Sequence, residues 1–394
     1  MDLTQIEKEL GFPVDLIDEG EVKVVVPSMS FYVRSDGIYE PAHAPVFYNP
    51  KAKFNRDTAI EIARIYRASN NSLTVLEPLA GSGVRSVRYA KEANADFVLA
   101  ADLNPLAIRL LNVNAKLNSV DKKIRAIQED AHVVLHSKKI RETYYDIVDI
   151  DPFGSPIPFL DGAVRSVKRN GLIALTATDT AALSGARPNT ALRRYSVKIV
   201  RTPFSKEVAI RTLISAAIRL AAIREVALRP LFSFFKDYYV RVTFKAERGA
   251  GRVDETLKNL GYLYINGLEV IPIKGYPLPE DAVSNPRKLI GPIWLGNLTD
   301  EKFFKDKLEI VKNEEIKKFL LRILEEDSIG VPYSYSIESI CSSLKTHMPK
   351  PKLVVERLKE LGYRAVITHY DYRNVKTNAP LDVVMNIVRD LSPR

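Results

Sequence analysis

The chain has 394 residues, a formal net charge of +10 and a hydrophobic fraction of 46%, with a single cysteine. At roughly 150 residues per domain this length predicts two or three domains, and the composition excludes a disordered or collagen-like chain. One cysteine, Cys341, provides neither an intramolecular disulfide nor a thiolate zinc site, which favours a reducing, cytoplasmic environment. We find no signal peptide or membrane span, since arginines interrupt even the aliphatic stretch 208–228. The basic excess is compatible with a polyanionic partner.

Between residues 73 and 178 the sequence alternates short β-branched runs with longer helical patterns, which is typical of βαβ units in a parallel sheet. Strands are expected at 73–76, 97–101, 124–128, 146–150 and 171–176, with helices at 82–92 and 105–117. Upstream, we expect strands at 22–26 and 30–33 and a helix at 56–68. These elements predict a doubly wound α/β fold that binds ligands at the carboxyl ends of its strands.

Downstream, residues 206–228 are expected to form one long, mostly apolar helix that packs against the sheet. Two aromatic runs, 231–235 and 238–244, are expected to pair as antiparallel edge strands. A stretch containing glycine and proline begins near Asn266 and extends to residue 292. We therefore expect one domain at 1–265 and a smaller C-terminal α+β domain at 266–394. Its expected elements are helices at 301–325, 336–344 and 351–361 and a strand at 364–368.

The first expected strand ends near Glu77 and leads into a small-residue turn with Gly81 and Gly83, which opens a helix. Glycines let the backbone approach a ligand closely. The G-x-G-x-x-G pattern of dinucleotide-binding proteins requires a third glycine, which is missing here, so an NAD-dependent dehydrogenase is the least favoured function. The turn instead resembles the first motif of class I S-adenosylmethionine-dependent methyltransferases. Taken alone, it is equally compatible with a strand-to-helix turn that binds no ligand.

Acidic residues also follow the next two strands. Asp102 lies 19 residues after Gly83, where a carboxylate can accept hydrogen bonds from both hydroxyls of a ribose. Asp130 lies where a carboxylate can accept from an adenine amino group, although it could instead cap the helix that begins near His132. Acids at three successive strand ends favour a nucleoside-containing cofactor over a scaffold without a ligand.

The fourth strand ends in the sequence Asp151-Pro152-Phe153-Gly154-Ser155-Pro156. Proline removes an amide donor and stiffens the turn, which leaves the Asp151 carboxylate and a backbone carbonyl to accept hydrogen bonds from an exocyclic amino group. Two such acceptors localise the nitrogen lone pair that is otherwise delocalised into the ring. Asp151 can then take the released proton as general base, while Phe153 offers a stacking face for the base. An exposed turn with a helix cap is the less favoured alternative.

With these motifs the chain resembles the tRNA guanine-N2 dimethyltransferase family. Besides Asp151-Pro152-Phe153-Gly154-Ser155-Pro156, the resemblance rests on residues 45–50, 55–57, 176–179, 236–239, 249, 254–255, 260–262, 291–296, 368–369 and 376–377. It therefore spans most of the chain, from about residue 22 to 380. The resemblance implies a methyltransferase that moves one and then a second methyl group from S-adenosylmethionine to N2 of a guanosine, typically at position 26 of tRNA.

Transferred residue by residue, the resemblance implies cofactor contacts at Arg56, Arg85, Asp102, Asp130 and Ala131, and a catalytic carboxylate at Asp151. It also implies that Phe47 and Phe153 hold the extruded guanine. From the residues alone, Arg56 could belong to a solvated basic cluster, Phe47 to the core, and Arg85 to an ion pair with Glu77. Some relatives carry a four-cysteine zinc site after the leucine-glycine-tyrosine segment, but residues 262–277 contain no cysteine, so no metal is expected here.

Five basic residues and no acid lie between positions 186 and 201, namely Arg187, Arg193, Arg194, Lys198 and Arg201. As a cluster beyond the fifth strand they favour contacts with RNA phosphates over a merely exposed loop. The C-terminal domain is also expected to bind tRNA, although Glu356 and Glu360 dilute its basic residues. Guanosine 26 must be extruded from a folded tRNA before it can react. Two alternatives stay open: methylation of another RNA amino group, such as adenine N6 or a ribosomal guanine N2, and a non-catalytic RNA-binding role.

Overall fold

The computed structural model describes residues 3–278 and 285–392. The chain divides into two compact units that interleave along the sequence. The first comprises the described residues up to 151 together with 161–174 and 304–317, and the second comprises 152–160, 175–303 and the described residues from 318 onward. None of the helices in these described ranges is long and apolar enough to cross a membrane.

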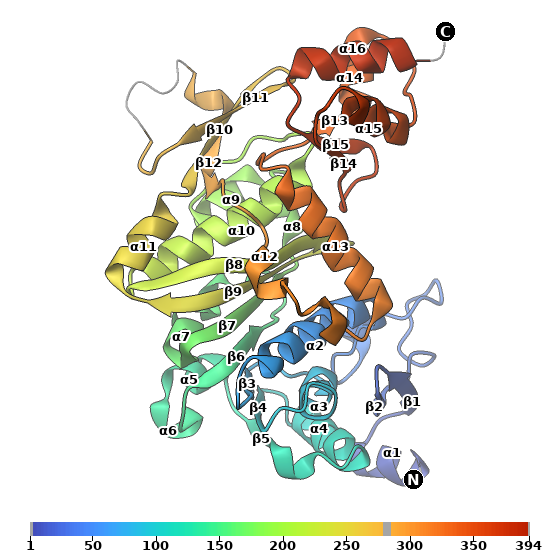
Figure 1. Cartoon of the computed structure of the whole chain (residues 1–394). Helices are drawn as coiled ribbons and strands as arrows, with labels where there is room; N and C mark the ends of the chain where they lie inside the picture. The colour runs from blue at the N-terminus through green and yellow to red at the C-terminus, as the bar shows by residue number, and fades with distance from the viewer. Residues whose placement is uncertain (1–2, 279–284, 393–394) are drawn as a thin grey trace. The chain divides into compact units, whose positions relative to one another are not determined.

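The first unit contains a parallel sheet and the helices that cover it (Figure 1). Its elements are α1 (Leu3–Leu10), β1 (Val14–Glu19), β2 (Val22–Pro27), α2 (Lys53–Ala68), β3 (Thr74–Glu77), α3 (Val84–Lys91), β4 (Phe97–Asp102), α4 (Pro105–Leu117), β5 (Ile124–Gln128), α5 (Ala131–His136), α6 (Lys138–Arg141), β6 (Tyr145–Ile150) and α7 (Leu160–Ser166). Helix α3 packs between α2 and α4, and the three lie side by side in the figure. Strand β7 (Val167–Ala177) contributes to both units.

Strand β3 pairs in parallel with β4 and β6, and β4 pairs in parallel with β5. All six residues of β6 are buried, as expected for a central strand of a parallel sheet that is covered on both faces. The full strand order is β5-β4-β3-β6-β7-β9-β8, which confirms the expected doubly wound α/β fold. Strands β3, β4, β5 and β6 match the expected ranges to within one residue, and β7 begins four residues earlier than expected. Their carboxyl ends share one edge of the sheet.

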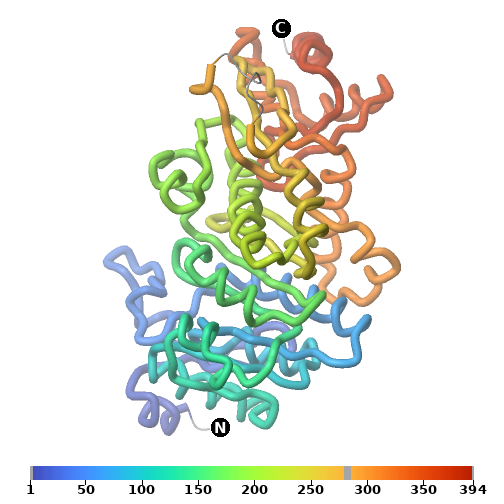
Figure 2. The backbone as a smooth tube through the Cα atoms, turned by 90° about the vertical axis from the view of Figure 1, so that its left-hand side faces the viewer, coloured from blue at the N-terminus to red at the C-terminus, as the bar shows by residue number. Residues whose placement is uncertain are grey.

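The N-terminal segment forms a hairpin and a helix that pack against α4. Strands β1 and β2 pair antiparallel over six residues. Ile6 and Leu10 of α1 join Val25 of β2 and Leu110 of α4 in one apolar cluster, and Figure 2 shows the blue N-terminal segment beside the cyan one. The expected strand at 30–33 is wrong. Strand β2 pairs with β1 instead. Residues 28–33 form a turn, in which the amide of Tyr32 donates a hydrogen bond to the carbonyl of Ser28.

The second unit begins with the turn after β6 and includes the antiparallel half of the sheet. Its elements are α8 (Thr180–Leu183), α9 (Pro188–Tyr195), α10 (Ser205–Ala222), β8 (Val226–Lys236), β9 (Tyr239–Arg248), α11 (Ala250–Leu257), β10 (Leu260–Asn266), β11 (Glu269–Lys274), β12 (Leu289–Trp294), α12 (Glu301–Phe304), α13 (Glu314–Ser328, from Lys318), β13 (Tyr335–Ser336), α14 (Ile337–Leu344), α15 (Pro351–Glu360), β14 (Ala365–Ile367), β15 (Asn374–Thr377) and α16 (Leu381–Leu391). Strands β8 and β9 pair antiparallel, which confirms the expected aromatic hairpin.

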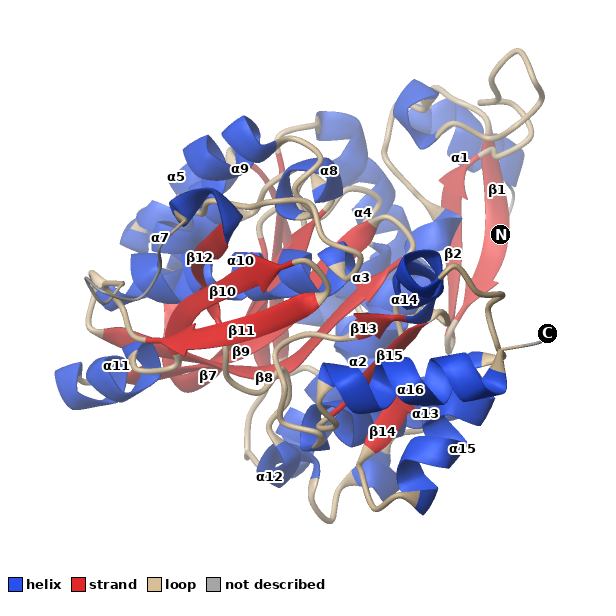
Figure 3. Cartoon of the chain, turned by 90° about the horizontal axis from the view of Figure 1, so that it is seen from above, coloured by secondary structure: helices blue, strands red, loops and turns tan. Residues whose placement is uncertain are grey.

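Two smaller sheets belong to the second unit. One has the order β11-β10-β12 and the other β13-β15-β14. Helices α14, α15 and α16 surround the latter, as Figure 3 shows, and bury a separate apolar core that includes Ile337, Val354, Leu358 and Val384. The expected boundary near Asn266 lies in the turn between β10 and β11. Residues 279–284 of the stretch from Asn266 to Pro292 lie outside the described residues.

Two expected helices are wrong in their extent. The helix expected at 206–228 ends at Ala222, because residues from Val226 onward pair with β9 and Glu225 adopts a left-handed φ of 53° between the two elements. The helix expected at 301–325 is two helices, α12 and α13, separated by a turn in which Asp306 has a φ of 60°. Asn313 starts the second helix by accepting hydrogen bonds from the amides of residues 315 and 316.

A buried ionic cluster links α10 to the C-terminal strands within the second unit. The carboxylate of Glu207 accepts hydrogen bonds from Lys376 Nζ at 2.5 Å, Arg211 Nη2 at 2.9 Å and the Tyr370 hydroxyl at 2.5 Å. Burial raises the pKa of Glu207, but the charges of Lys376 and Arg211 outweigh this effect and lower it to about 2. The cluster therefore holds an ionised carboxylate in the interior.

Candidate active site

The turn after β3 adopts a conformation that favours glycine. Gly81 and Gly83 have φ values of 53° and 72°, in the left-handed region that other residues seldom adopt. A Cβ on Gly83 would lie 2.3 Å from Leu111 Cγ of α4, so only glycine permits this approach of the two helices. The amide of Gly81 donates to Asp102 Oδ2 at 2.8 Å, which fixes the turn to the end of β4.

Asp102 organises the loop around it through both carboxylate oxygens. Its Oδ2 holds the amide of Gly81, and its Oδ1 accepts from the amide of Asn104 at 2.9 Å. Each carboxylate oxygen can accept a second hydrogen bond. Asp102 is half-buried, and the neighbouring Leu103 is 66% exposed. The carboxylate therefore keeps acceptor capacity at the strand edge. The helix cap is Asn104, whose Oδ1 accepts from the amide of Leu106.

Asp130 is the N-cap of α5. Its Oδ1 accepts hydrogen bonds from the amides of His132 at 2.8 Å and Val133 at 3.3 Å, so the capping role considered from the sequence is present. In the described part of the chain, Oδ2 has no such partner. Ala131, which follows, is buried as the first residue of the helix.

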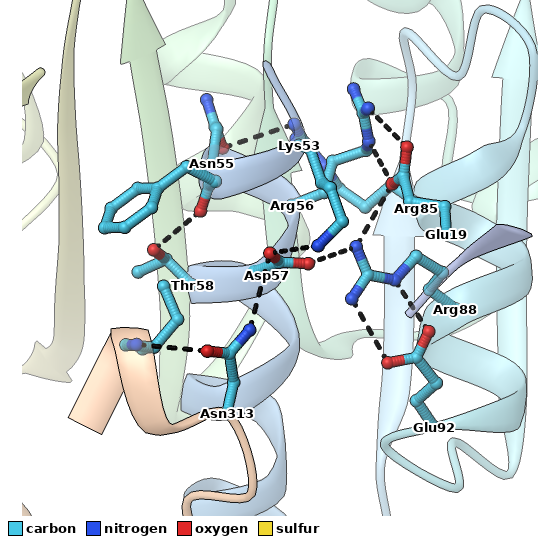
Figure 4. A network of polar contacts seen from close by, with 12 residues as sticks. Glu19, Lys53, Asn55, Arg56, Asp57, Thr58, Arg85, Arg88, Glu92 and Asn313 are labelled. Atoms are coloured by element: carbon cyan, nitrogen blue, oxygen red, sulfur yellow. Dashed lines mark hydrogen bonds and ion pairs between the residues drawn. The ribbon is translucent and has the colours of Figure 1, made fainter. Parts of the chain in front are cut away.

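Arg56 lies on α2 within a network of charged side chains (Figure 4). Its Nε and Nη2 donate to the two oxygens of Glu19, both at 2.6 Å, and Nη1 and Nη2 donate to the carbonyl of Asn49 at 3.2 Å. Burial raises the pKa of Glu19, but the hydrogen bond and charge of Arg56 lower it to about 2. Arg56 is thus a buried, paired residue that fixes the backbone at position 49, two residues after Phe47.

Phe47 lies beside the glycine turn. Its carbonyl oxygen is 3.2 Å from the position that a Cβ on Gly81 would occupy, and the carbonyl of Pro45 accepts a hydrogen bond of 2.7 Å from Asn104 Nδ2. The Phe47 side chain is 38% exposed. The segment that carries this aromatic residue is therefore anchored at the same strand edge as Asp102.

Arg85 and Asp151 are directly paired. Arg85 Nη2 donates to Asp151 Oδ2, Nη1 donates to Asp149 Oδ1 at 2.9 Å, and Nε lies 3.7 Å from Glu77 Oε1. The Arg85 side chain is 4% exposed and that of Asp151 is 24% exposed. The sequence suggested an ion pair between Arg85 and Glu77, and this contact is the longest of the three that Arg85 makes with acids. Asp151, just past the end of β6, is the most accessible of the three acids.

Phe153 belongs to the turn that opens the second unit. Its side chain is 76% exposed. The turn is fixed by Gly154, whose amide donates to Thr178 Oγ1 at 2.8 Å and whose carbonyl accepts from the Thr178 amide at 2.9 Å. Phe153 is therefore an exposed phenylalanine in a hydrogen-bonded turn and not part of the buried core.

Several residues that shape this edge were missed by the sequence analysis. Asp149 is fully buried and accepts from the Tyr89 hydroxyl at 2.7 Å as well as from Arg85. The sequence did contain a signal for Asp149. It lies two residues before Asp151, and because side chains alternate along a strand, residues two apart lie on the same face. Glu19 gave no signal, since it belongs to no motif and is brought in by tertiary structure. Asn55 lies in the matched segment 55–57, but the sequence assigned no role to it. Asn55 accepts from Arg85 Nη2 at 3.3 Å.

If the strands of the seven-stranded sheet are numbered from 1 in chain order, starting at β3, their order across the sheet is 3-2-1-4-5-7-6. Parallel strands are followed by an antiparallel hairpin, β8 and β9, at one edge. Together with a glycine turn after the first strand and acids after the next ones, this arrangement defines the class I S-adenosylmethionine-dependent methyltransferase fold. Comparison with known proteins identifies the family. The family model for N2,N2-dimethylguanosine tRNA methyltransferases matches residues 20–389, and the chain belongs to this family.

Relatives resemble the chain over nearly its whole length. It is 34% identical over 385 residues to the tRNA (guanine(26)-N(2))-dimethyltransferase of Methanococcus maripaludis and 36% identical over 386 residues to that of Sulfurisphaera tokodaii. Both alignments cover 95% of this chain and 98% of the relative. The solved structure of Trm1 from Pyrococcus horikoshii, a complex with S-adenosyl-L-methionine, is similar with a TM-score of 0.81 and 30% identity, covering 95% of this chain and 99% of that one.

No group of three or more histidine, cysteine, aspartate or glutamate side chains in the described ranges could hold a metal ion.

Proposed function

We propose that this protein transfers one and then a second methyl group from S-adenosylmethionine to the exocyclic N2 of guanosine 26 in tRNA. Family membership supports the reaction class. The observation that carries the proposal is the state of Asp151, which stands at the carboxyl end of β6 with Oδ2 held by Arg85. Among the described residues its Oδ1 has no hydrogen-bond partner, and it is the acceptor available to an amino group. We further infer a cytoplasmic location, where tRNA and reduced cysteine are both found.

The cofactor fits the strand edge beside the glycine turn. Asp102 keeps a free lone pair on each oxygen and would hold the ribose hydroxyls, and Asp130 with Ala131 would contact the adenine. Gly81 presents backbone without a side chain at this point. When bound, S-adenosylmethionine supplies a methyl group on a positively charged sulfur, which makes that carbon electrophilic.

The chemistry on the nucleobase is assigned to Asp151. Its carboxylate accepts a hydrogen bond from the N2 amino group, orients the nitrogen lone pair and takes the proton released as the methyl group is transferred. Because Asp151 precedes Pro152, its backbone is restricted to extended conformations, which limits the directions of the side chain. Before a second transfer, Asp151 must release this proton to solvent, and the monomethylated amine must rotate to present its remaining hydrogen to the same oxygen.

Phe47 and Phe153 are proposed to contact the extruded guanine. Both are exposed, which is unusual for phenylalanine and suited to stacking on a base. RNA phosphates are proposed to bind the exposed basic residues at and around α9, which are Arg187, Arg193, Arg194, Lys198 and Arg201.

Residues 266–394 are proposed to contact a further part of the tRNA. Helix α15 exposes Lys352, Arg357 and Lys359, although each is paired with a glutamate.

The test is a methyl-transfer assay on purified protein with labelled S-adenosylmethionine and unmodified tRNA transcripts. Digestion to nucleosides is expected to give N2-methylguanosine and N2,N2-dimethylguanosine, and replacement of guanosine 26 should abolish both.

Asp151→Asn should bind the cofactor with unchanged affinity and lose a factor of about 10² to 10⁴ in turnover. Wild-type turnover in that variant would remove Asp151 from proton transfer. Methylated adenosine, or activity only on ribosomal RNA, would favour another amino-group target. Binding of tRNA without transfer would indicate an RNA-binding protein.

A further inference from the structure

Arg85 is placed to hold Asp151 by its position in α3. Helix α3 begins at Val84, directly after the glycine turn. Arg85 is its second residue and therefore lies close to the carboxyl ends of β3 and β6. There Nη1 is taken by Asp149, and Nη2 is shared between Asp151 Oδ2 and Asn55 Oδ1. Asp149 is itself fixed by Tyr89, so the guanidinium has a rigid support on one side and the more exposed Asp151 on the other.

The charges around Arg85 favour a lasting bond to Asp151. One guanidinium faces three acids, Glu77, Asp149 and Asp151. Burial raises the pKa of Glu77 to about 7, despite the lowering effect of the Arg85 charge, so near neutral pH this carboxyl is protonated for much of the time. The positive charge is then balanced chiefly by Asp149 and Asp151. Loss of Arg85 would leave two carboxylates close together in a largely buried site, each without its counter-ion.

We propose that Arg85 is a positioning residue for methyl transfer, which fixes the Asp151 carboxylate by its Oδ2 and leaves Oδ1 directed to the amino group of the base. The inference rests on the catalytic role proposed for Asp151. It adds a second role to the cofactor contact that the family resemblance implies for Arg85, because its Nη2 is engaged by two oxygens of the protein. The side chain of Asp151 lies beyond the last residue of β6, and no other described side chain holds it.

The experiment compares Arg85→Gln and Arg85→Lys with Arg64→Gln as a matched control. Arg64 is also buried and also held by carboxylates, at 2.6 Å from Glu21 and 2.7 Å from Glu61, but it contacts neither Asp151 nor the glycine turn. We expect Arg85→Gln to lower kcat about 10²-fold at saturating S-adenosylmethionine, as misplacement of a catalytic group by about 1 Å does, whatever its effect on the Kd for the cofactor. Arg85→Lys, which keeps the charge but not the forked geometry, should recover part of kcat. Arg64→Gln should lower stability and leave kcat of the folded enzyme unchanged.

A second measurement separates orientation from folding. In Arg85→Ala, guanidinium ions at millimolar concentration should raise kcat saturably and at least about tenfold, because they can occupy the vacated position, whereas Asp151→Asn should not respond. If Arg85→Gln loses cofactor affinity while kcat at saturation is retained, Arg85 binds the cofactor and the proposal is overturned. Equal loss of kcat in Arg85→Gln and Arg64→Gln, without rescue, would reduce its role to stability. If Asp151→Asn is itself fully active, the catalytic assignment fails first, whatever Arg85 does.

Discussion

Asn104 Nδ2 donates a hydrogen bond of 2.7 Å to the carbonyl oxygen of Pro45. The same side chain caps α4 through its Oδ1, and its backbone amide is held by Asp102. One residue therefore connects the strand end proposed to bind the ribose with the segment that carries Phe47. This bond gives a physical reason for expecting the base-binding and cofactor-binding parts of the first unit to be coupled.

Asn104→Ser should separate these two roles. Serine retains the capping oxygen but is too short to reach Pro45, so stability should stay near that of the wild type while the segment around Phe47 loosens. We expect a several-fold increase in KM for tRNA. Asn104→Ala removes the cap as well and should cost about 1 kcal/mol more in stability. Thermal denaturation and steady-state kinetics on both variants provide the comparison. An unchanged KM in Asn104→Ser would show that the bond to Pro45 has no functional effect.

Gly83→Ala tests the packing of the glycine turn. The new Cβ would lie 2.3 Å from Leu111 Cγ and would hold an unfavourable φ of 72°, so we expect a loss of about 2 to 4 kcal/mol in stability. Gly37→Ala is the matched control, because Gly37 has a similar φ of 78° but nothing within 4 Å of its Cβ position. It should cost only about 1 kcal/mol. Chemical denaturation of both variants measures the difference. Equal losses would mean that backbone conformation, rather than the contact with Leu111, makes glycine necessary.

The sequence predicts the elements of the parallel sheet well, because each strand is a short run rich in β-branched and aliphatic residues and helical patterns separate the runs. It also predicts that Asp102, Asp130 and Asp151 meet at one edge, since parallel strands carry their carboxyl ends to the same side. The failures lie where tertiary pairing overrides local pattern. Residues 223–228 continue the apolar helical pattern, yet those from Val226 onward join β8 because β9 offers a partner along its whole length.

Most partners of Arg56 and Arg85 could not be predicted, although the sequence did suggest the ion pair of Arg85 with Glu77. Arg56 and Arg85 look from the sequence like exposed or ligand-binding residues, and Glu19 lies 37 positions before Arg56 in a separate hairpin. Ion pairs between distant elements depend on how the elements pack, and a single sequence does not specify that packing. Asp149 is different, because its two-residue spacing from Asp151 within a buried strand predicts that both acids share one face.

The buried carboxylate of Glu207 predicts a loss of stability in acid. The pKa of Glu207 is about 2 in the folded protein, whereas the ordinary pKa of a glutamate is 4.5. The charge of Glu207 therefore stabilises the fold fully above pH 4.5. The stabilisation decreases as pH falls from 4.5 to about 2, and the difference corresponds to about 3 kcal/mol. Apparent melting temperatures of the wild type and Glu207→Gln, measured from pH 6 to pH 2, provide the test. The variant should start lower and show a shallower decline. Parallel curves would mean that Glu207 does not titrate between these limits.

The basic surface at α9 predicts how tRNA binding depends on salt. Arg193 and Arg201 are exposed and have no carboxylate partner among the described residues, whereas Arg194 lies 2.8 Å from Asp179. A cation that neutralises a phosphate releases a counter-ion, so Arg193→Ala and Arg201→Ala should each reduce the slope of log Kd against log salt by about 1. Arg194→Ala should reduce it less, because its charge is already paired within the protein.

The exposed Arg252 lies outside this cluster and serves as the control, whose alanine variant should keep the wild-type slope. If all four variants keep that slope, the tRNA backbone does not contact α9. If Arg252→Ala and the cluster variants reduce it equally, the basic charge acts as a diffuse field and specific phosphate contacts at α9 are excluded.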